Sequence, residues 1–293
     1  MLAKPTGIII GPILSLYLFV KRRSVHTAFF PLLGTTGGVI LYGFYNWIRF
    51  GHLLDFGAPR IFKLEFIPSG LLGLLVSPGM GLLWYSPVII LSIIAFFEVV
   101  KSKRILEAVT VVGIFLSYLM IYSIWNMWSG GWSWGPRFLL PSLPGLVALI
   151  ALLDHKWKKI ILILTLLGFV INAPTLVSFY ERYYSEAYEK EIPFKKLLWS
   201  PSYSPIYRMW GAAYRQIKDA SETDVRDLVR EASLPENGPS PTIATSQAFR
   251  IVALWWWMLP IVGISRWVGV VCMFCLIGFG VCLLLKGYKS ILV

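Results

Sequence analysis

Few residues of this sequence carry a charge, and few can bind a metal ion. Charged residues make up 14% of the 293 residues, with only 15 Asp and Glu, 3 His and 3 Cys. The hydrophobic fraction is 57% and the mean hydropathy is +0.68. A folded domain in water needs more charged residues than this to cover its surface. The composition therefore excludes a soluble globular protein and predicts an integral membrane protein.

Motifs that mark common soluble enzymes are also missing. The sequence contains no G-x-x-x-x-G-K-[ST] phosphate-binding loop, no G-x-G-x-x-G opening a helix, no H-E-x-x-H and no G-x-S-x-G. Cys272, Cys275 and Cys282 share one apolar run without a nearby His or carboxylate, so they fit small packing residues better than metal ligands. The sequence thus identifies no cofactor and no metal site, while a divalent metal stays an open alternative.

Basic residues outnumber acidic ones, which gives a formal net charge of +12. They form short clusters between apolar runs and no continuous stripe, so we expect no nucleic-acid partner. Clusters at residues 21–23, 101–104 and 156–159 follow every second apolar run. By the positive-inside rule these loops face the cytoplasm, which predicts a multi-pass protein of the cytoplasmic (inner) membrane.

Long apolar runs predict seven or eight membrane-spanning helices and hence an all-α fold, a polytopic transmembrane bundle. The third run is too long for one span, and Pro78, Gly79 and Gly81 predict a break in it, with a short re-entrant or juxtamembrane helix before the true span. The runs cover residues 5–20, 27–47, 71–100, 105–127, 138–153, 159–180, 251–264 and 267–285.

The predicted organisation has three parts. Residues 1–180 form a transmembrane helical domain with outer loops at 48–70 and 128–137. Residues 181–250 hold most of the acidic residues and several prolines, so they are predicted to form a small extracytoplasmic cap. Residues 251–293 are predicted to form a C-terminal transmembrane hairpin.

Within the cap, Ser221 has the form of a helix N-cap. Glu222 and Asp224 follow it as an acidic first turn, and Val225 begins a modest apolar face. This pattern predicts a helix from Ser221 to about Ala232.

A tryptophan-rich segment, residues 125–137, leads directly into the apolar run that begins at residue 138. Indole faces bind sugar rings and a guanidinium binds phosphate, so the segment is a candidate site for a lipid-linked sugar. Trp132 and Trp134 are the candidates for contact with the donor sugar or lipid, and Arg137 is the candidate for its phosphate. The same residues also fit an aromatic belt, with Arg137 reaching toward the lipid headgroups. Both interpretations stay open.

Three strings of the sequence resemble the C-terminal part of bacterial GT-C glycosyltransferases, the multispanning relatives of protein mannosyltransferases and aminoarabinose transferases. The strings are residues 45–57, 77–87 and 131–141. Residues 4–7, which open the first run with a lysine, resemble the basic residue that begins a middle span in that family. The resemblance covers most of residues 1–180.

The resemblance implies an enzyme that transfers a sugar from a polyprenyl-phosphate donor to an acceptor hydroxyl on the outer face of the membrane. Arg137 and Lys4 would then hold the donor phosphate. The catalytic acid of the family lies in an earlier outer loop, which would precede Met1, so the resemblance implies a C-terminal half completed by a separate N-terminal half or partner subunit. Asp55 and Glu65 are weak candidates for the base, since both also fit solvated loop charges.

Two other functions stay open. The chain also fits a non-catalytic membrane subunit that binds a polyprenyl lipid or scaffolds a complex among membrane lipids. A transporter is less favoured, because the predicted spans hold hardly any ionisable residues apart from Glu98 and Glu107, near their cytoplasmic ends.

Overall fold

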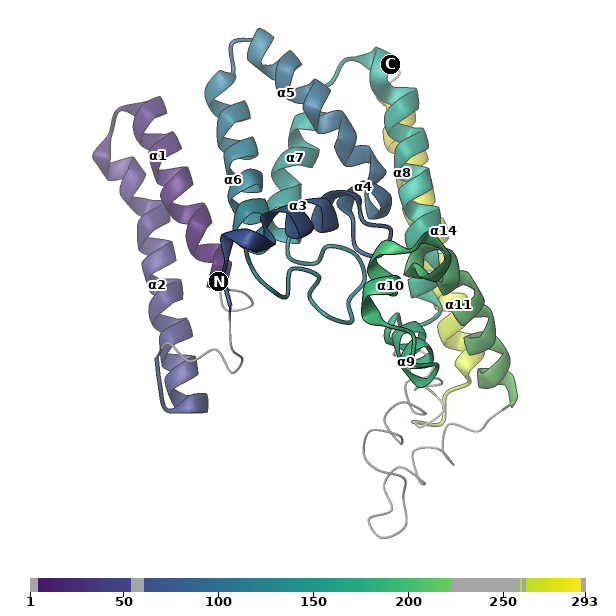
Figure 1. Cartoon of the computed structure of the whole chain (residues 1–293). Coiled ribbons are helices and arrows are strands. Elements are labelled where there is room, and N and C mark those ends of the chain that lie inside the picture. The colour runs from purple at the N-terminus through teal and green to yellow at the C-terminus, as the bar shows by residue number, and fades with distance from the viewer. Residues whose placement is uncertain (1–4, 54–60, 223–258, 260–261, 291–293) are drawn as a thin grey trace. The chain divides into compact units, whose positions relative to one another are not determined.

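The structure is a computed structural model that describes residues 5–53, 61–222, 259 and 262–290, and it is almost entirely helical (Figure 1). These residues form no β-strand, and Phe62 and Trp125 form an isolated antiparallel bridge. The all-α prediction is confirmed. By its internal contacts the chain divides into a first unit, Met1–Phe169, and a second unit, Val170–Val293. The domain boundaries expected after residues 180 and 250 stay predictions.

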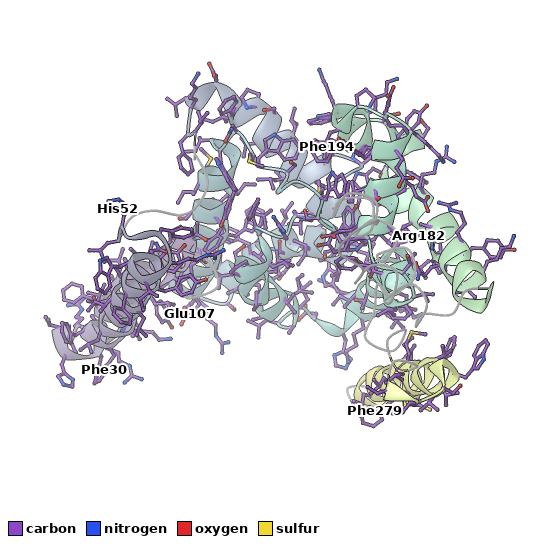
Figure 2. All side chains as sticks on the ribbon, turned by 90° about the horizontal axis from the view of Figure 1, so that it is seen from below. Phe30, His52, Glu107, Arg182, Phe194 and Phe279 are labelled. Carbon is purple, nitrogen blue, oxygen red and sulfur yellow. The ribbon has the colours of Figure 1, made fainter. Side chains whose placement is uncertain are left out.

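The first unit begins with a helical hairpin. A short 3-10 helix, η1 (Pro5–Ile9), leads into α1 (Ile10–Arg22), and α2 (Val25–Phe50) returns alongside it. Arg23 adopts a left-handed conformation and Ser24 caps α2, with its side-chain oxygen accepting a hydrogen bond from the backbone N–H of Thr27. Phe30 points outward from α2 and is 61% exposed, as suits a helix that faces lipid (Figure 2).

The predicted break near Pro78 is confirmed. The 3-10 helix η2 (Leu64–Phe66) leads into α3 (Ile67–Val76), the backbone turns over residues 77–81, and α4 (Leu82–Tyr85) follows. The turn is tied by backbone hydrogen bonds, of which Gly81 N–H to the Ser77 carbonyl measures 2.7 Å. The 3-10 helix η3 (Pro87–Ile90) then leads into α5 (Leu91–Lys101). The re-entrant or juxtamembrane position of α3 stays a prediction.

The rest of the first unit packs around the longest of its central helices, α6 (Ile105–Ser123), which contacts α1, α3, α5 and α7. After α6 the chain passes through η4 (Leu140–Ser142), α7 (Leu143–Ile150) and η5 (His155–Trp157). It continues into α8 (Lys158–Asn172), whose last residues belong to the second unit together with η6 (Ala173–Leu176). Side chains buried almost completely in this unit include Leu74, Met80, Leu82, Tyr118, Leu139 and Leu146.

The second unit contains shorter, more polar helices. They are α9 (Glu181–Glu189), α10 (Phe194–Trp199), η7 (Pro201–Tyr203) and α11 (Pro205–Glu222), followed by the apolar helix α14 (Arg266–Ser290). The predicted helix start at Ser221 is wrong, because Ser221 lies in the last turn of α11; the continuation to Ala232 lies outside the described residues.

By length and composition, three helical stretches among the described residues are long and apolar enough to cross a membrane. They are Val25–Phe50, Ile105–Ser123 and His155–Leu176. Shorter apolar stretches occur at Leu64–Val76 and Leu140–Ile150. A membrane location fits these helices, and the larger number of spans stays a prediction.

The basic clusters gather at one end of the first unit, which we call the basic end. Figure 1 shows the turns between α1 and α2, α5 and α6, and α7 and α8 at the same upper end of this unit. Lys21, near the end of α1, forms an ion pair of 2.5 Å with Glu107, near the start of α6. The geometry therefore places residues 21–23, 101–104 and 156–159 on one side, as the alternation of basic loops in the sequence requires.

Candidate functional site

The tryptophan-rich segment lies at the end of the first unit opposite the basic end, and we call residues 124–138 the aromatic loop. Its first residues pair with the other outer segment of the sequence. The backbone N–H of Lys63 donates to the carbonyl of Ile124 at 2.8 Å, and that of Asn126 donates to the carbonyl of Ile61 at 3.0 Å. Two segments that the sequence placed on the outer face are thus in contact.

Stacked rings hold the start and the end of the aromatic loop together. The rings of Tyr122 and Phe138 stack with their centroids 4.4 Å apart, and Trp125 lies 5.1 Å from Phe138. The ring of Phe62 stacks on the other side of Trp125 at 6.4 Å. Aromatic contacts of this kind add to the stability given by burial alone. The ring cluster therefore joins the two ends of the loop. Arg137 lies next to this cluster, directly before Phe138.

Arg137 is exposed and its guanidinium is oriented by the loop itself. One terminal nitrogen, Nη2, donates a hydrogen bond of 2.7 Å to the carbonyl of Gly130, and the guanidinium carbon lies 5.3 Å from the centre of the Phe138 ring. Gly130 has φ +76°, and a Cβ built there would lie 2.9 Å from Nε of Arg137. The position of the guanidinium thus depends on a glycine at residue 130.

The two tryptophans predicted to contact the donor differ in their surroundings. Trp132 is 40% exposed. Trp134 is partly buried, with its ring edge-on to Tyr85 at 5.0 Å, and the Tyr85 hydroxyl donates to the carbonyl of Gly79 at 2.7 Å. Trp134 therefore connects the loop to the break after α3, which leaves Trp132 as the better placed ring for a ligand.

Two further tryptophans of the loop serve its packing. Trp128 is 7% exposed, and its ring lies so close to Gly73 of α3 that a Cβ there would come within 2.2 Å. Trp125 lies in the ring cluster, and its indole Nε1 is buried without a hydrogen-bond partner among the described residues. An aromatic belt needs rings at the surface, so Trp128 does not fit that interpretation. Sequence spacing gave no signal for this difference.

Of the remaining predicted site residues, the structure describes Glu65 alone. Glu65 is exposed and pairs with Lys63 at 3.0 Å. Asp55 and Lys4 lie outside the described residues. Over the described part of the chain, no group of three or more His, Cys, Asp and Glu is arranged to hold a metal ion.

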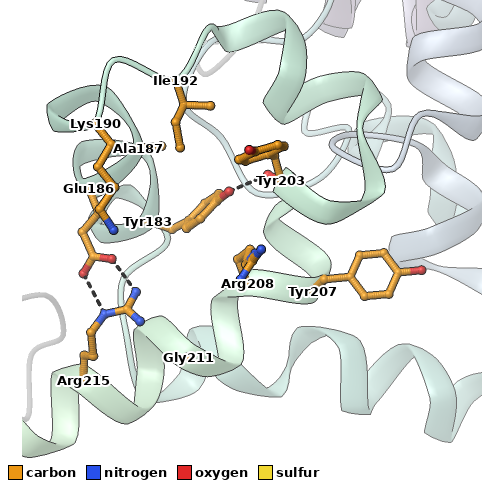
Figure 3. A pocket seen from close by; sticks show the side chains of 10 residues that line it. All are labelled: Tyr183, Glu186, Ala187, Lys190, Ile192, Tyr203, Tyr207, Arg208, Gly211 and Arg215. Atoms are coloured by element: carbon orange, nitrogen blue, oxygen red, sulfur yellow. Dashed lines mark hydrogen bonds and ion pairs between the residues drawn. The ribbon is translucent and has the colours of Figure 1, made fainter.

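A second polar site, which the sequence analysis missed, lies in the second unit. Helices α9 and α11 border a cavity of about 350 Å³, the α9–α11 cavity (Figure 3). Its lining residues are Tyr183, Glu186, Ala187, Lys190, Ile192, Tyr203, Tyr207, Arg208, Gly211 and Arg215. The signal available in the sequence was the seven-residue spacing of Arg208 and Arg215, which places both on one face of a helix.

A buried ion-pair network supports this cavity. Arg182, 2% exposed, donates from Nε to Oε1 of Glu186 at 2.9 Å and from Nη1 to the side-chain oxygen of Gln216 at 2.9 Å. Arg215 also pairs with Glu186. Burial opposes ionisation of Glu186, but the hydrogen bonds from Arg215 and Arg182 outweigh it and hold the pKa of this carboxyl below its usual value.

Comparison with known proteins gives no family for this chain. No protein-family model, no curated protein and no solved structure matches it. The function is therefore argued from the geometry of the aromatic loop and of the helices that carry it.

Proposed function

We propose that this chain is a membrane glycosyltransferase, or its C-terminal half, which transfers a sugar from a polyprenyl-phosphate donor to an acceptor hydroxyl on the outer face of the membrane. The observation that carries the proposal is that one ordered loop carries both an exposed guanidinium, Arg137, and an exposed indole, Trp132. A guanidinium binds phosphate with several hydrogen bonds, and an indole face packs on a sugar ring.

The basic end supports the proposed location. Because all three basic turns lie at that end, the positive-inside rule assigns it to the cytoplasm and assigns the aromatic loop to the outer face. In this proposal the bundle has seven or eight spans in the cytoplasmic membrane, and residues 181–250 form the outer cap. The apolar helix α14 (Arg266–Ser290) supplies an additional span.

The proposed chemistry gives each group one role. The acceptor oxygen attacks the anomeric carbon of the sugar, the bond from that carbon to the phosphate oxygen breaks, and polyprenyl phosphate leaves. Arg137 stabilises the negative charge that develops on the leaving phosphate. A base takes the proton of the acceptor hydroxyl. Asp55 and Glu65 are the candidates for that base within this chain, and a separate N-terminal half is the source that the family resemblance implies.

Transfer by membranes that contain the chain tests the proposal. Membranes that contain the chain are incubated with radiolabelled polyprenyl-phosphate sugars, with and without co-expression of the product of the neighbouring gene. The radiolabel transferred to acceptor molecules is measured. Arg137→Ala is expected to lower transfer about 100-fold, because it removes a charged donor from the transition state. The matched control is Arg49→Ala, since Arg49 is also exposed but bonds to Tyr45 at the end of α2. Equal transfer by the Arg137→Ala protein and the wild type would contradict the proposal.

A non-catalytic membrane subunit that binds a polyprenyl lipid is the second candidate. The observation that favours it is that Glu65, the described candidate for the base, is an exposed carboxylate already held in an ion pair with Lys63. This candidate predicts binding of polyprenyl phosphate that depends on Arg137, without transfer under any of the conditions above.

A further inference from the structure

The charges around the α9–α11 cavity do not cancel. Lys190, Arg208 and Arg215 line it together with one carboxylate, Glu186. Glu186 already pairs with Arg215 and with buried Arg182, so its charge is compensated on both sides. Lys190 and Arg208 make no ion pair among the described residues. The cavity therefore presents two positive charges without a carboxylate to balance them.

Arg208 is held in position for binding. Its Nε donates to the backbone carbonyl of Ser202 at 2.7 Å, and the structure gives its two terminal nitrogens no hydrogen bond to any described residue. Figure 3 shows Arg208 at the cavity on the side of Tyr183 and Tyr203, with the Tyr207 ring pointing away from it. When a guanidinium is fixed through Nε, its terminal N–H groups can form a bidentate pair of hydrogen bonds with an anion such as phosphate.

Tyrosines supply the rest of the wall. The Tyr183 hydroxyl donates to the carbonyl of Tyr203 at 2.5 Å. Burial raises the pKa of Tyr183 to about 12, so this wall stays neutral and does not repel an anion at physiological pH. The rings of Tyr203 and Tyr207 also line the cavity. Tyrosine rings pack on the carbon-bound hydrogens of a sugar while their hydroxyls stay in water.

The cavity also lies beside a helix face of the type found at membrane interfaces. Tyr207, Trp210, Tyr214 and Ile217 are all exposed along α11, at the spacing of one helix face. Aromatic side chains next to arginines are typical of the headgroup region of a bilayer. Helix α11 also packs against η6, which ends the apolar stretch His155–Leu176.

We propose that the α9–α11 cavity binds a phosphorylated sugar, either free or as the headgroup of a lipid, with the phosphate held by Arg208 and Lys190 and the sugar ring against Tyr203. The volume of about 350 Å³ suits a ligand of that size. The inference does not rest on the proposed function, because its residues belong to the second unit and Arg137 belongs to the first.

Binding to the full chain in lipid nanodiscs tests the inference. Mannose 1-phosphate, inorganic phosphate and mannose are titrated separately by calorimetry, and a further arm uses nanodiscs that contain polyprenyl-phosphate mannose. We expect the phosphorylated sugar to bind more tightly than mannose or phosphate alone. Binding of the free sugar phosphate, or of the lipid-linked form alone, would each support the inference and would identify the source of the ligand. Equal affinity for mannose and mannose 1-phosphate would overturn it.

Variants of the cavity make the test specific. Arg208→Gln is expected to weaken binding about tenfold or more, because hydrogen bonds to a charged group are lost. Lys190→Gln is expected to weaken it as well, and it removes no side-chain hydrogen bond to any residue that the structure describes. Lys195→Gln, an exposed lysine of α10 outside the lining, is the matched control and should bind as the wild type does. Unchanged binding in both cavity variants would overturn the inference. Arg137→Ala should leave this binding intact, so a failure of the proposed function stays distinguishable.

Discussion

Gly130 is the residue on which the orientation of Arg137 most directly depends. Gly130 and Gly131 have similar left-handed backbones, with φ +76° and +70°, so any other residue strains both positions by about 1–2 kcal/mol. A Cβ at Gly130 meets Nε of Arg137 at 2.9 Å and the Phe138 ring at 3.0 Å, whereas a Cβ at Gly131 meets nothing within 4 Å. The two positions therefore separate backbone strain from the contact with Arg137.

We predict that Gly130→Ala lowers sugar transfer at least tenfold, while Gly131→Ala changes it little. Both variants should lose a similar free energy of unfolding from the backbone, and Gly130→Ala should lose about 1–3 kcal/mol more from the close contact. Transfer assays and thermal unfolding in detergent measure the two effects. Equal transfer by the two variants would show that the side chain of Arg137 is not held through Gly130.

Glu186 makes the stability of the second unit depend on pH. Its pKa is lowered in the folded state, so the stability that it contributes is complete above the pKa of about 4.3 of an unfolded chain. That contribution is lost as the pH falls through the lower folded pKa. We predict that Glu186→Gln lowers the free energy of unfolding at pH 7 by about 3 kcal/mol, since it removes the carboxylate that pairs with buried Arg182.

The measurement is the unfolding midpoint as a function of pH, followed between pH 7 and pH 3. The difference between the wild type and the Glu186→Gln protein should narrow as the carboxyl protonates. Glu189→Gln, an exposed glutamate on the same helix, should follow the wild type throughout. A difference that stays constant with pH would assign the destabilisation to packing and not to the ion pairs.

At the scale of elements, α3 is the support of the aromatic loop. Trp128 packs on Gly73, where an added Cβ would lie 2.2 Å from the ring. We predict that Gly73→Ala lowers the free energy of unfolding by about 1–3 kcal/mol, because the ring has to move. Gly113→Ala on α6 meets nothing within 4 Å and should be neutral or stabilising. Chemical unfolding followed by tryptophan fluorescence checks both, and equal stability of the two variants would argue against this contact.

The helices show which features of the fold could be predicted from the sequence. Composition was enough to predict an all-helical fold, and Pro78 and Gly79 were enough to predict the break after α3, because both effects are local. The Ser221 helix start was wrong because a serine followed by acidic residues also occurs within the last turn of a helix that had already begun at Pro205.

Contacts between distant segments account for most of what the sequence did not give. Trp132 and Trp134 look alike in the sequence, but the ring of Tyr85, far away in the chain, covers the second and not the first. The α9–α11 cavity was missed for the same reason, because Lys190 and Arg208 become neighbours of one cavity only after α9 and α11 pack together. The sequence shows that these residues are basic, but it does not show that they line the same cavity.

In the proposed topology of the whole protein, the basic end and the aromatic loop face opposite sides of a membrane. We predict that a cysteine at Ser129 reacts with a membrane-impermeant maleimide in intact cells, after Cys272, Cys275 and Cys282 are replaced by serine. A cysteine at Ser102, in the turn between α5 and α6, should react only after the membrane is opened. Labelling of the cysteine at position 102 in intact cells would show that the orientation is the opposite of the proposed one.

Contact between the donor and Trp132 is the central claim, and site-specific photo-crosslinking tests it most directly. A photoreactive amino acid replaces Trp132 in one protein and Trp47 in another, since both rings are exposed but Trp47 lies on α2 away from the aromatic loop. Both proteins are irradiated with radiolabelled polyprenyl-phosphate sugar. We expect an adduct at Trp132 that excess unlabelled donor removes, and little at Trp47. Equal, non-competed labelling at the two positions would contradict it and would identify the loop as part of an aromatic belt.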